Sequence, residues 1–234
     1  MRIGVTLPTF SDDAAAVLGA AREAESLGIH GVFSFDHLWP LGHPERPSLS
    51  LFPVLGAVAA VTDRLRVGSL VARLGLLPDA VVVSSLLSLA EISGGRLIAG
   101  LGTGDDASME EHTRNGILYL GTPARHESLR EVSAFLLAEG VECWVGAGKA
   151  STNETARSSG AILNYWGATP ERLARAAALG PVTWGGPLPD DAGAAASTLQ
   201  GLSQAGASWA VWGWPSSLAA VVGAAERAGI PLGS

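Results

Sequence analysis

Two residues suited to proton chemistry stand side by side near the start of the chain. Asp36 and His37 directly follow the apolar run Val32–Phe35. A histidine titrates near neutral pH, and a carboxylate beside it can fix which ring nitrogen carries the proton. The pair therefore indicates a proton-handling site at the end of a strand. The structural alternative is that Asp36 caps a turn and His37 is an ordinary loop residue.

A glycine-rich segment follows a later apolar run. Gly100, Gly102 and Gly104 alternate with other residues just before Asp105. Glycines let a ligand approach backbone N–H groups, and the Asp105 carboxylate could accept a hydrogen bond from a ring N–H. The dinucleotide-binding pattern of three spaced glycines is not met, because Ala107 stands at the third position. The structural alternative is a tight turn.

A third segment, residues 146–152, combines two glycines, the chain's only lysine and two hydroxyl side chains. It lies between an expected strand and an expected helix start, where backbone N–H groups and the helix dipole favour an anion such as phosphate. It is not a Walker A loop, because Cys143 stands at the first glycine position and Ala150 at the Ser/Thr position. The structural alternative is a solvated loop.

Eight apolar runs recur along the chain, each followed by a turn and an amphipathic segment. The expected strands are Ile3–Leu7, Val32–Phe35, Leu65–Val71, Arg96–Gly100, Val141–Val145, Ala161–Tyr165, Val182–Trp184 and Trp209–Gly213. The expected helices are Asp13–Leu27, Leu51–Val61, Asp79–Ile92, Arg125–Glu139, Thr152–Ser159, Pro170–Leu179, Asp191–Gln204 and Ser216–Ala228. This alternation predicts an α/β chain, a single compact (β/α)8 TIM barrel over residues 1–234 with reduced insertions. A doubly wound open sheet stays possible, because periodicity does not reveal closure. In a barrel, the three segments would meet at the carboxyl mouth.

Composition excludes several classes of protein. The 234 residues are 47% hydrophobic and 16% charged, which suits a buried core and not a disordered chain. The net charge of −7 argues against a binder of nucleic acid or of anionic membranes. One cysteine excludes an intrachain disulfide, and the histidines lack metal-ligand spacing, so no metal site is expected. Without a signal peptide or an apolar span, we expect a cytoplasmic protein.

Together these segments resemble the bacterial luciferase-like superfamily, and within it the oxidoreductases that depend on coenzyme F420, a deazaflavin. The resemblance is carried by Asp36-His37, by Leu65–Ser69, by Ser93–Arg96 and by Gly102–Asp105. It covers residues 1–105 well, and little of the chain beyond residue 140.

The resemblance implies an oxidoreductase that holds F420 at the barrel mouth and moves a hydride between its ring and a small organic substrate. His37 would handle the proton, with Asp36 beside it at the ring, and Asp105 would be a second acid or base. A non-proline cis peptide is expected at Val71–Ala72 or its neighbour, against the ring. Further cofactor contacts are expected from Gly102, Gly104, Gly146, Ala147 and Gly148. From charge and location, Lys149 and Thr152 would assist with the phosphate.

Other functions stay open at this point. The runner-up is an FMN-dependent luciferase-like monooxygenase supplied with reduced flavin. A barrel that binds flavin or deazaflavin without catalysis is a further alternative, because the chain lacks insertions that would build a lid. A phosphosugar-type barrel could use the same phosphate loop. The family resemblance also implies a homodimer and, as a partner, a flavin or F420 reductase that supplies reduced cofactor.

Overall fold

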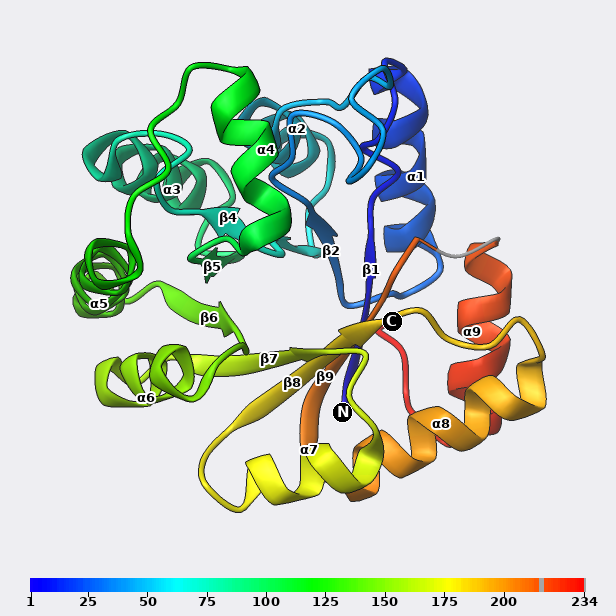
Figure 1. Cartoon of the computed structure of the whole chain (residues 1–234). Helices are drawn as coiled ribbons and strands as arrows, with labels where there is room; N and C mark the ends of the chain where they lie inside the picture. The colour runs from blue at the N-terminus through cyan, green and yellow to red at the C-terminus, as the bar shows by residue number, and fades with distance from the viewer. Residues whose placement is uncertain (215–216, 234) are drawn as a thin grey trace.

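Parallel strands form one continuous sheet that curls into a ring, with helices around its outside (Figure 1). The computed structural model describes residues 1–214 and 217–233. Within these ranges nine strands follow the order β3-β2-β1-β9-β8-β7-β6-β5-β4. The strands are β1 (Arg2–Thr6), β2 (Gly31–Ser34), β3 (Arg66–Ser69), β4 (Ala72–Arg73), β5 (Leu97–Gly102), β6 (Glu142–Gly146), β7 (Ile162–Trp166), β8 (Val182–Gly186) and β9 (Ala207–Trp212). The helices are α1 (Ala14–Ser26), α2 (Leu51–Val61), α3 (Asp79–Ile92), α4 (Asp106–Arg114), α5 (Thr122–Ala138), α6 (Ala150–Ser159), α7 (Pro170–Ala177), α8 (Ala192–Gln204) and α9 (Leu218–Arg227).

The ring closes where β3 pairs with β5, with Gly68 beside Ile98. Strand β4 has two residues and continues the path of β3, and its Ala72 pairs with Leu101 of β5. Strands β3 and β4 therefore share one position of the ring, and the strands described above make an eight-position (β/α)8 barrel. The predicted TIM barrel is confirmed, and the alternative of an open sheet is wrong.

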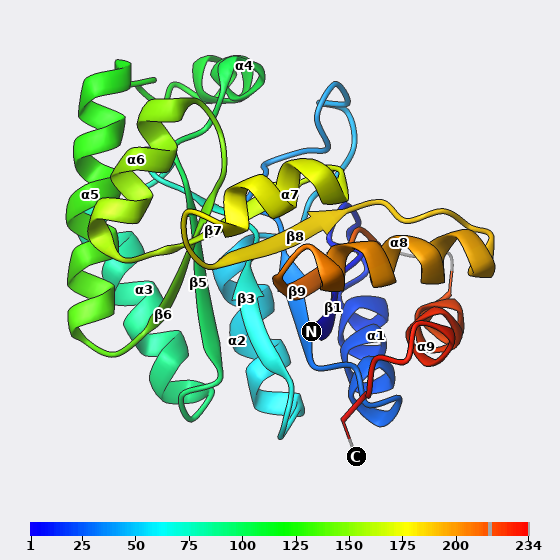
Figure 2. The same cartoon turned by 90° about the horizontal axis from the view of Figure 1, so that it is seen from below.

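The apolar helices α2 and α3 were easier to predict than the polar helix α4. Helices α2 and α3 have the predicted bounds, whereas α4 was not expected and α5 begins before its predicted start. Figure 2 shows α4 and the loop after β2 rising from the same end of the barrel. None of the helices in the described part of the chain is long and apolar enough to cross a lipid bilayer.

Aromatic rings fill the middle of the barrel. Phe33 stacks on Trp144 at 5.2 Å between ring centroids, and both rings contact Trp209. Gly4 and Gly68 make room for them, because a Cβ on either residue would lie 2.8 or 2.6 Å from the ring of Phe33. The barrel is therefore a packed core and not a channel, which leaves its mouth for binding and chemistry.

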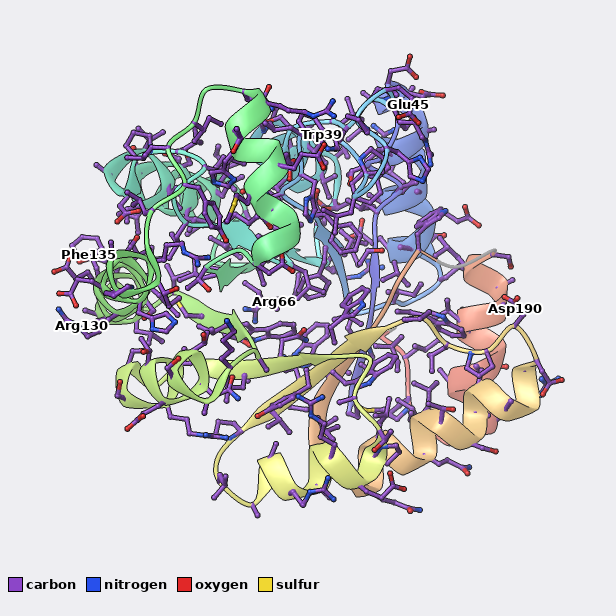
Figure 3. All side chains as sticks on the ribbon, viewed as in Figure 1. Trp39, Glu45, Arg66, Arg130, Phe135 and Asp190 are labelled. Atoms are coloured by element: carbon purple, nitrogen blue, oxygen red, sulfur yellow. The ribbon has the colours of Figure 1, made fainter. Side chains whose placement is uncertain are left out.

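A polar cluster lies within the strands beside this aromatic core. The Nε1–H of Trp144 donates to Glu142 (2.9 Å), and Glu142 forms an ion pair with Arg66 at 2.8 Å. Arg66 also donates to the backbone carbonyls of Arg96 and Leu97. Figure 3 shows Arg66 within the ring of strands, whereas Arg130 and Phe135 lie outside it.

Arg96 explains one of the family-like segments, Ser93–Arg96. Its guanidinium donates to the carbonyls of Ala59 and Thr62 at the end of α2, of Leu65 before β3 and of Ser93 after α3. The side chain thus joins two helix ends to the start of a strand. This segment precedes β5, at the end of the barrel opposite the carboxyl mouth, and stabilises the fold there.

Candidate active site at the carboxyl mouth of the barrel

The ring of His37 is held by a carboxylate from a distant helix. Its Nδ1 lies 3.1 Å from Oε2 of Glu111, which is on α4. The second carboxylate oxygen of Glu111 accepts a hydrogen bond from the backbone N–H of Leu38. The Glu111 side chain is 1% exposed, whereas that of His37 is 18% exposed. The contacts on Glu111 therefore anchor one side of an imidazole that solvent still reaches.

Arg73 joins Glu111 to the end of β2. Its Nη1 lies 2.6 Å from Oε2 of Glu111, and its Nε donates to the backbone carbonyl of Asp36 at 2.7 Å. The backbone N–H of Arg73 donates to the Asp36 carboxylate at 2.9 Å. Arg73 is 4% exposed, and its Nη2 has no hydrogen-bond partner within the described ranges. One buried cation thus holds both acidic residues beside His37.

The pKa values of the two carboxyl groups are shifted in opposite directions. Burial would raise the pKa of Glu111, but the hydrogen bond with His37, the charge of Arg73 and the Leu38 N–H together hold this pKa at about 2. Burial raises the pKa of Asp36, against the opposing effects of the Arg73 N–H and charge. Glu111 is therefore an anion at working pH, and it compensates the buried charge of Arg73.

An aromatic contact crosses the mouth. Phe35 follows β2 and Trp166 ends β7, and these strands are four steps apart in the ring in either direction. Their rings nevertheless meet edge to face at 5.7 Å between centroids, and Phe10 stacks on Phe35 at 5.5 Å. The contact divides the mouth, and the ends of β4, β5 and β6 lie together on one side of it. Aromatic faces of this kind suit a planar, apolar ligand.

Glycines face Val71 on that side of the mouth. The peptide bond between Leu70 and Val71 is cis, at the neighbour of Val71–Ala72 that the sequence indicated. A Cβ on Gly102 would lie 2.3 Å from a methyl carbon of Val71, and one on Gly146 would lie 3.6 Å away. We call Val71, Gly102 and Gly146 the glycine cradle. Val71 is partly exposed and covers the buried Gly102, and Gly146 is partly exposed beside it.

The segment after β6 approaches the same mouth. The N–H of Ala147 donates to the carbonyl of Asn164, and the N–H of Gly148 donates to the side chain of Asn153. Lys149 is exposed and precedes α6, whose first turn has no hydrogen bond from a capping side chain. Thr152 is buried in that turn. Because Lys149 is exposed and no side chain caps the helix, the surface of the segment presents a positive charge and free helix N–H groups.

A histidine contacts this segment, and sequence reasoning did not connect the two. His126 of α5 approaches Thr152, with 3.1 Å between its Nε2 and the threonine Oγ1. The two residues are far apart in the sequence, and His126 is on a helix with a largely polar surface, so no sequence signal links them. The contact ties the first turn of α6 to α5.

Asp105 has a clear structural role. It is the N-cap of α4, and its carboxylate accepts hydrogen bonds from the N–H and the hydroxyl of Ser108. The hydroxyl of Tyr119 donates to its carbonyl, and Arg125 donates to the carbonyls of the two preceding residues, Thr103 and Gly104. Asp105 therefore begins the helix that carries Glu111, and its expected role as an acid or base stays a prediction.

Sequence reasoning found one half of the charged cluster and missed the other. Asp36 and His37 stood out because they end an apolar strand. Arg73 carried a weak signal, as a charged residue directly after Ala72 in an apolar stretch, and Glu111 had none within a polar helix. In the described residues no group of three or more histidine, cysteine, aspartate or glutamate side chains could hold a metal ion.

Comparison with known proteins agrees with the fold and extends over most of the chain. A curated relative, the F420-dependent glucose-6-phosphate dehydrogenase of Microbacterium testaceum, is 30% identical over 128 residues, which are 53% of this chain. The match spans only 35%, about a third, of that relative's length. The F420-dependent tetrahydromethanopterin reductase of Methanopyrus kandleri has a similar fold, with a TM-score of 0.74 at 13% identity over 96% of both chains.

A monooxygenase also shares the fold. RslO1 of Streptomyces bottropensis has a TM-score of 0.73 at 15% identity, over 97% of this chain and 96% of its own. The sequence pattern of the luciferase-like monooxygenase family matches residues 1–210. Because this pattern covers nearly the whole barrel, the protein belongs to the luciferase-like monooxygenase family, as the sequence resemblance indicated.

Proposed function

We propose that the protein is an F420-dependent oxidoreductase that moves a hydride between the deazaflavin and a small organic substrate at the barrel mouth. The observation that carries this proposal is the glycine cradle, which opens on the same mouth as His37. The names of the Microbacterium relative and of the Methanopyrus structure support F420 as the cofactor.

The residues of the mouth fit a planar cofactor that carries phosphate. Gly146 and the small side chain of Val71, which covers Gly102, offer a flat ring a surface without large side chains, and Trp166 offers an apolar face. The uncapped first turn of α6 offers N–H groups and the positive end of its dipole to a phosphate, and Lys149 adds a charge. Thr152 is buried in this turn, and its hydroxyl oxygen contacts His126. The remaining expected contacts, Gly104, Ala147 and Gly148, belong to the same two loops.

Two titratable residues at the mouth, His37 and Asp105, would handle protons in this proposal. When bound, the deazaflavin supplies the hydride donor or acceptor. His37 takes or gives the proton at the oxygen of the substrate. Phe10, whose ring centroid lies 6.1 Å from that of His37, limits the access of water to the imidazole. Asp105 is the second proposed proton group, at the exit of β5.

An FMN-dependent monooxygenase is the second candidate. The family name and the similar fold of RslO1 favour it. A barrel that only binds cofactor is less favoured, because it would need no buried ion pair of Arg73 and Glu111 behind a histidine. Buried ion pairs of this kind add little to stability compared with apolar packing. Oxygen consumption that depends on reduced FMN would identify the monooxygenase.

A parallel titration with F420 and FMN tests the proposal. Cofactor fluorescence and calorimetric heat should show tighter binding of F420, and F420 absorbance should then report turnover over a panel of small alcohols and carbonyl compounds. His37→Ala should keep cofactor binding and lose turnover, whereas His43→Ala, at an exposed histidine, should retain both. Tighter binding of FMN would move the function to flavin chemistry, and binding of neither cofactor would overturn the proposal.

We also infer two partners from the family. The protein is expected to form a homodimer, and a flavin or F420 reductase is expected to supply the reduced cofactor. Sedimentation velocity tests the first expectation. Reconstitution of turnover with a reductase in place of chemically reduced cofactor tests the second.

A further inference from the structure

We propose that Glu111 and Arg73 are positioning residues that hold His37 in a single neutral tautomer, with its proton on Nδ1 and a free acceptor at Nε2. The tautomer is a property of the protein without cofactor. Only its use in catalysis rests on the proposed function.

The hydrogen-bonding capacity of Glu111 determines which ring nitrogen of His37 carries the proton. An ionised carboxylate only accepts hydrogen bonds, so each of its partners must donate. The Leu38 N–H and the Arg73 Nη1 are donors in every protonation state. The Nδ1 of His37, 3.1 Å from Oε2 of Glu111, must therefore carry a hydrogen. In a neutral imidazole this leaves Nε2 without one.

Arg73 keeps Glu111 in the ionised state. Both side chains are almost fully buried, and a buried charge without a partner is strongly unfavourable. Asp36 does not take this role, because its carboxylate accepts from the backbone N–H of Arg73 while the guanidinium contacts its carbonyl. Without the guanidinium, Glu111 would bind a proton and become able to donate to His37. The tautomer would then lose its constraint.

Few other groups lie close enough to His37 to affect which of its ring nitrogens carries the proton. Among the described residues, the charged groups beside it are Asp36 on its own loop, Arg73 on β4 and Glu111 on α4. The nearest aromatic partner is Phe10. Arg73 hydrogen-bonds to both Asp36 and Glu111, so these three residues are held together. Nε2 is therefore the ring nitrogen available for proton exchange with a substrate.

Long-range proton–nitrogen NMR of the ¹⁵N-labelled protein without cofactor tests the tautomer directly. In alkaline buffer, the neutral ring of His37 should show a protonated Nδ1 and an unprotonated Nε2. The reverse pattern, or an averaged one, would overturn the proposal. A His37→Gln sample assigns the signal. This measurement on the unaltered chain does not depend on whether any variant at Glu111 or Arg73 folds.

Variants then separate positioning from support of the fold. Arg73→Lys keeps the positive charge and should retain the tautomer, whereas Arg73→Met should give an averaged or reversed pattern. Glu111→Gln should do the same, and turnover should fall at least tenfold, in the range typical of residues that orient a functional histidine. Arg130→Met removes an arginine from an exposed ion pair and should change neither measurement. An unaltered pattern in both Arg73→Met and Glu111→Gln would contradict the proposal.

The outcomes distinguish this inference from the proposed function. A protonated Nδ1 in a protein that binds neither F420 nor FMN would uphold the positioning of His37 and refute the function. Binding and turnover of F420 with a protonated Nε2 would do the opposite.

Discussion

A methyl group of Val71 lies directly over Gly102, so that a Cβ added to Gly102 would come within 2.3 Å of it. Gly146 on the next strand faces the same side chain with more room, and its Cβ would lie 3.6 Å from Val71. The two glycines thus face the same side chain from neighbouring strands. They differ in how much space separates them from their shared neighbour.

Alanine substitutions at these glycines should separate packing from binding. Gly102→Ala should lower the free energy of unfolding by about 1–3 kcal/mol, because the added methyl group overpacks the contact with Val71. Gly146→Ala should cost less than about 1 kcal/mol, since its new contact is of ordinary length. Both variants should weaken cofactor binding, because Gly146→Ala adds a methyl group to the cradle and Gly102→Ala displaces Val71. Urea unfolding and cofactor titration measure the two effects, and unaltered binding in both variants would show that the ring lies elsewhere.

The charge of Glu111 predicts a particular acid sensitivity. Its pKa of about 2 in the folded protein lies below its ordinary value of 4.5, so its stabilisation is complete above about pH 4.5 and is lost as the pH falls through about 2. The change is about 3 kcal/mol, since one pKa unit corresponds to about 1.4 kcal/mol. Asp36 acts in the opposite direction, because its raised pKa favours the folded protein as the pH falls.

Comparison with Glu111→Gln isolates this contribution. The variant should be less stable than the unaltered protein at neutral pH, because Arg73 loses its counter-charge. The difference between the two proteins should shrink as the pH falls. Urea unfolding at a series of pH values provides the measurement. A difference that stays constant down to about pH 2 would contradict the assignment.

How well each part could be predicted depends on the range of the interactions that form it. The apolar helices α2 and α3 follow from local sequence, and their bounds were predicted. Helix α4 is polar, and it depends on the cap formed by Asp105 and on the contacts of Glu111. Ring closure depends on the pairing of β3 with β5, which no local pattern reports.

The same distinction holds in the site. Asp36 and His37 were found because they stand at a strand end, where barrel chemistry is expected. Glu111 is 74 positions away from His37 in the sequence, and its contact depends on where the chain after β5 turns back across the mouth. Asp105, the carboxylate that sequence reasoning paired with His37, is the N-cap of that returning helix, and its role as a proton group stays a prediction.

Arg96 should be important for stability and unimportant for chemistry. Arg96→Lys should lower the free energy of unfolding by about 2 kcal/mol or more, because one ammonium cannot reach the carbonyls of Ala59, Thr62, Leu65 and Ser93 together. Cofactor affinity below the unfolding temperature should be unaltered. Loss of binding in a protein that remains folded would place Arg96 in the functional machinery and contradict this assignment.

The single cysteine should report unfolding. Burial, together with the nearby charge of Glu142, raises the pKa of Cys143 to about 12, so the thiol stays protonated and inaccessible in the native protein. A thiol reagent at mildly alkaline pH should therefore react only at the rate at which the barrel opens. One equivalent should react at once in concentrated urea. Prompt reaction in native buffer would show that β6 is accessible to reagent.

Trp166 should contribute to the binding of a planar cofactor more than to stability. It is 49% exposed and contacts Phe35 from the opposite strand, so Trp166→Ala removes an aromatic face from the mouth and little buried area. The dissociation constant for F420 should rise several-fold to about tenfold, since such aromatic contacts contribute about 0.5–1.5 kcal/mol. Phe135 is the control, because it is 48% exposed and lies on α5, outside the ring of strands (Figure 3). Phe135→Ala should leave the affinity unaltered, and equal effects of the two substitutions would argue against a ring site bounded by Trp166 and the glycine cradle.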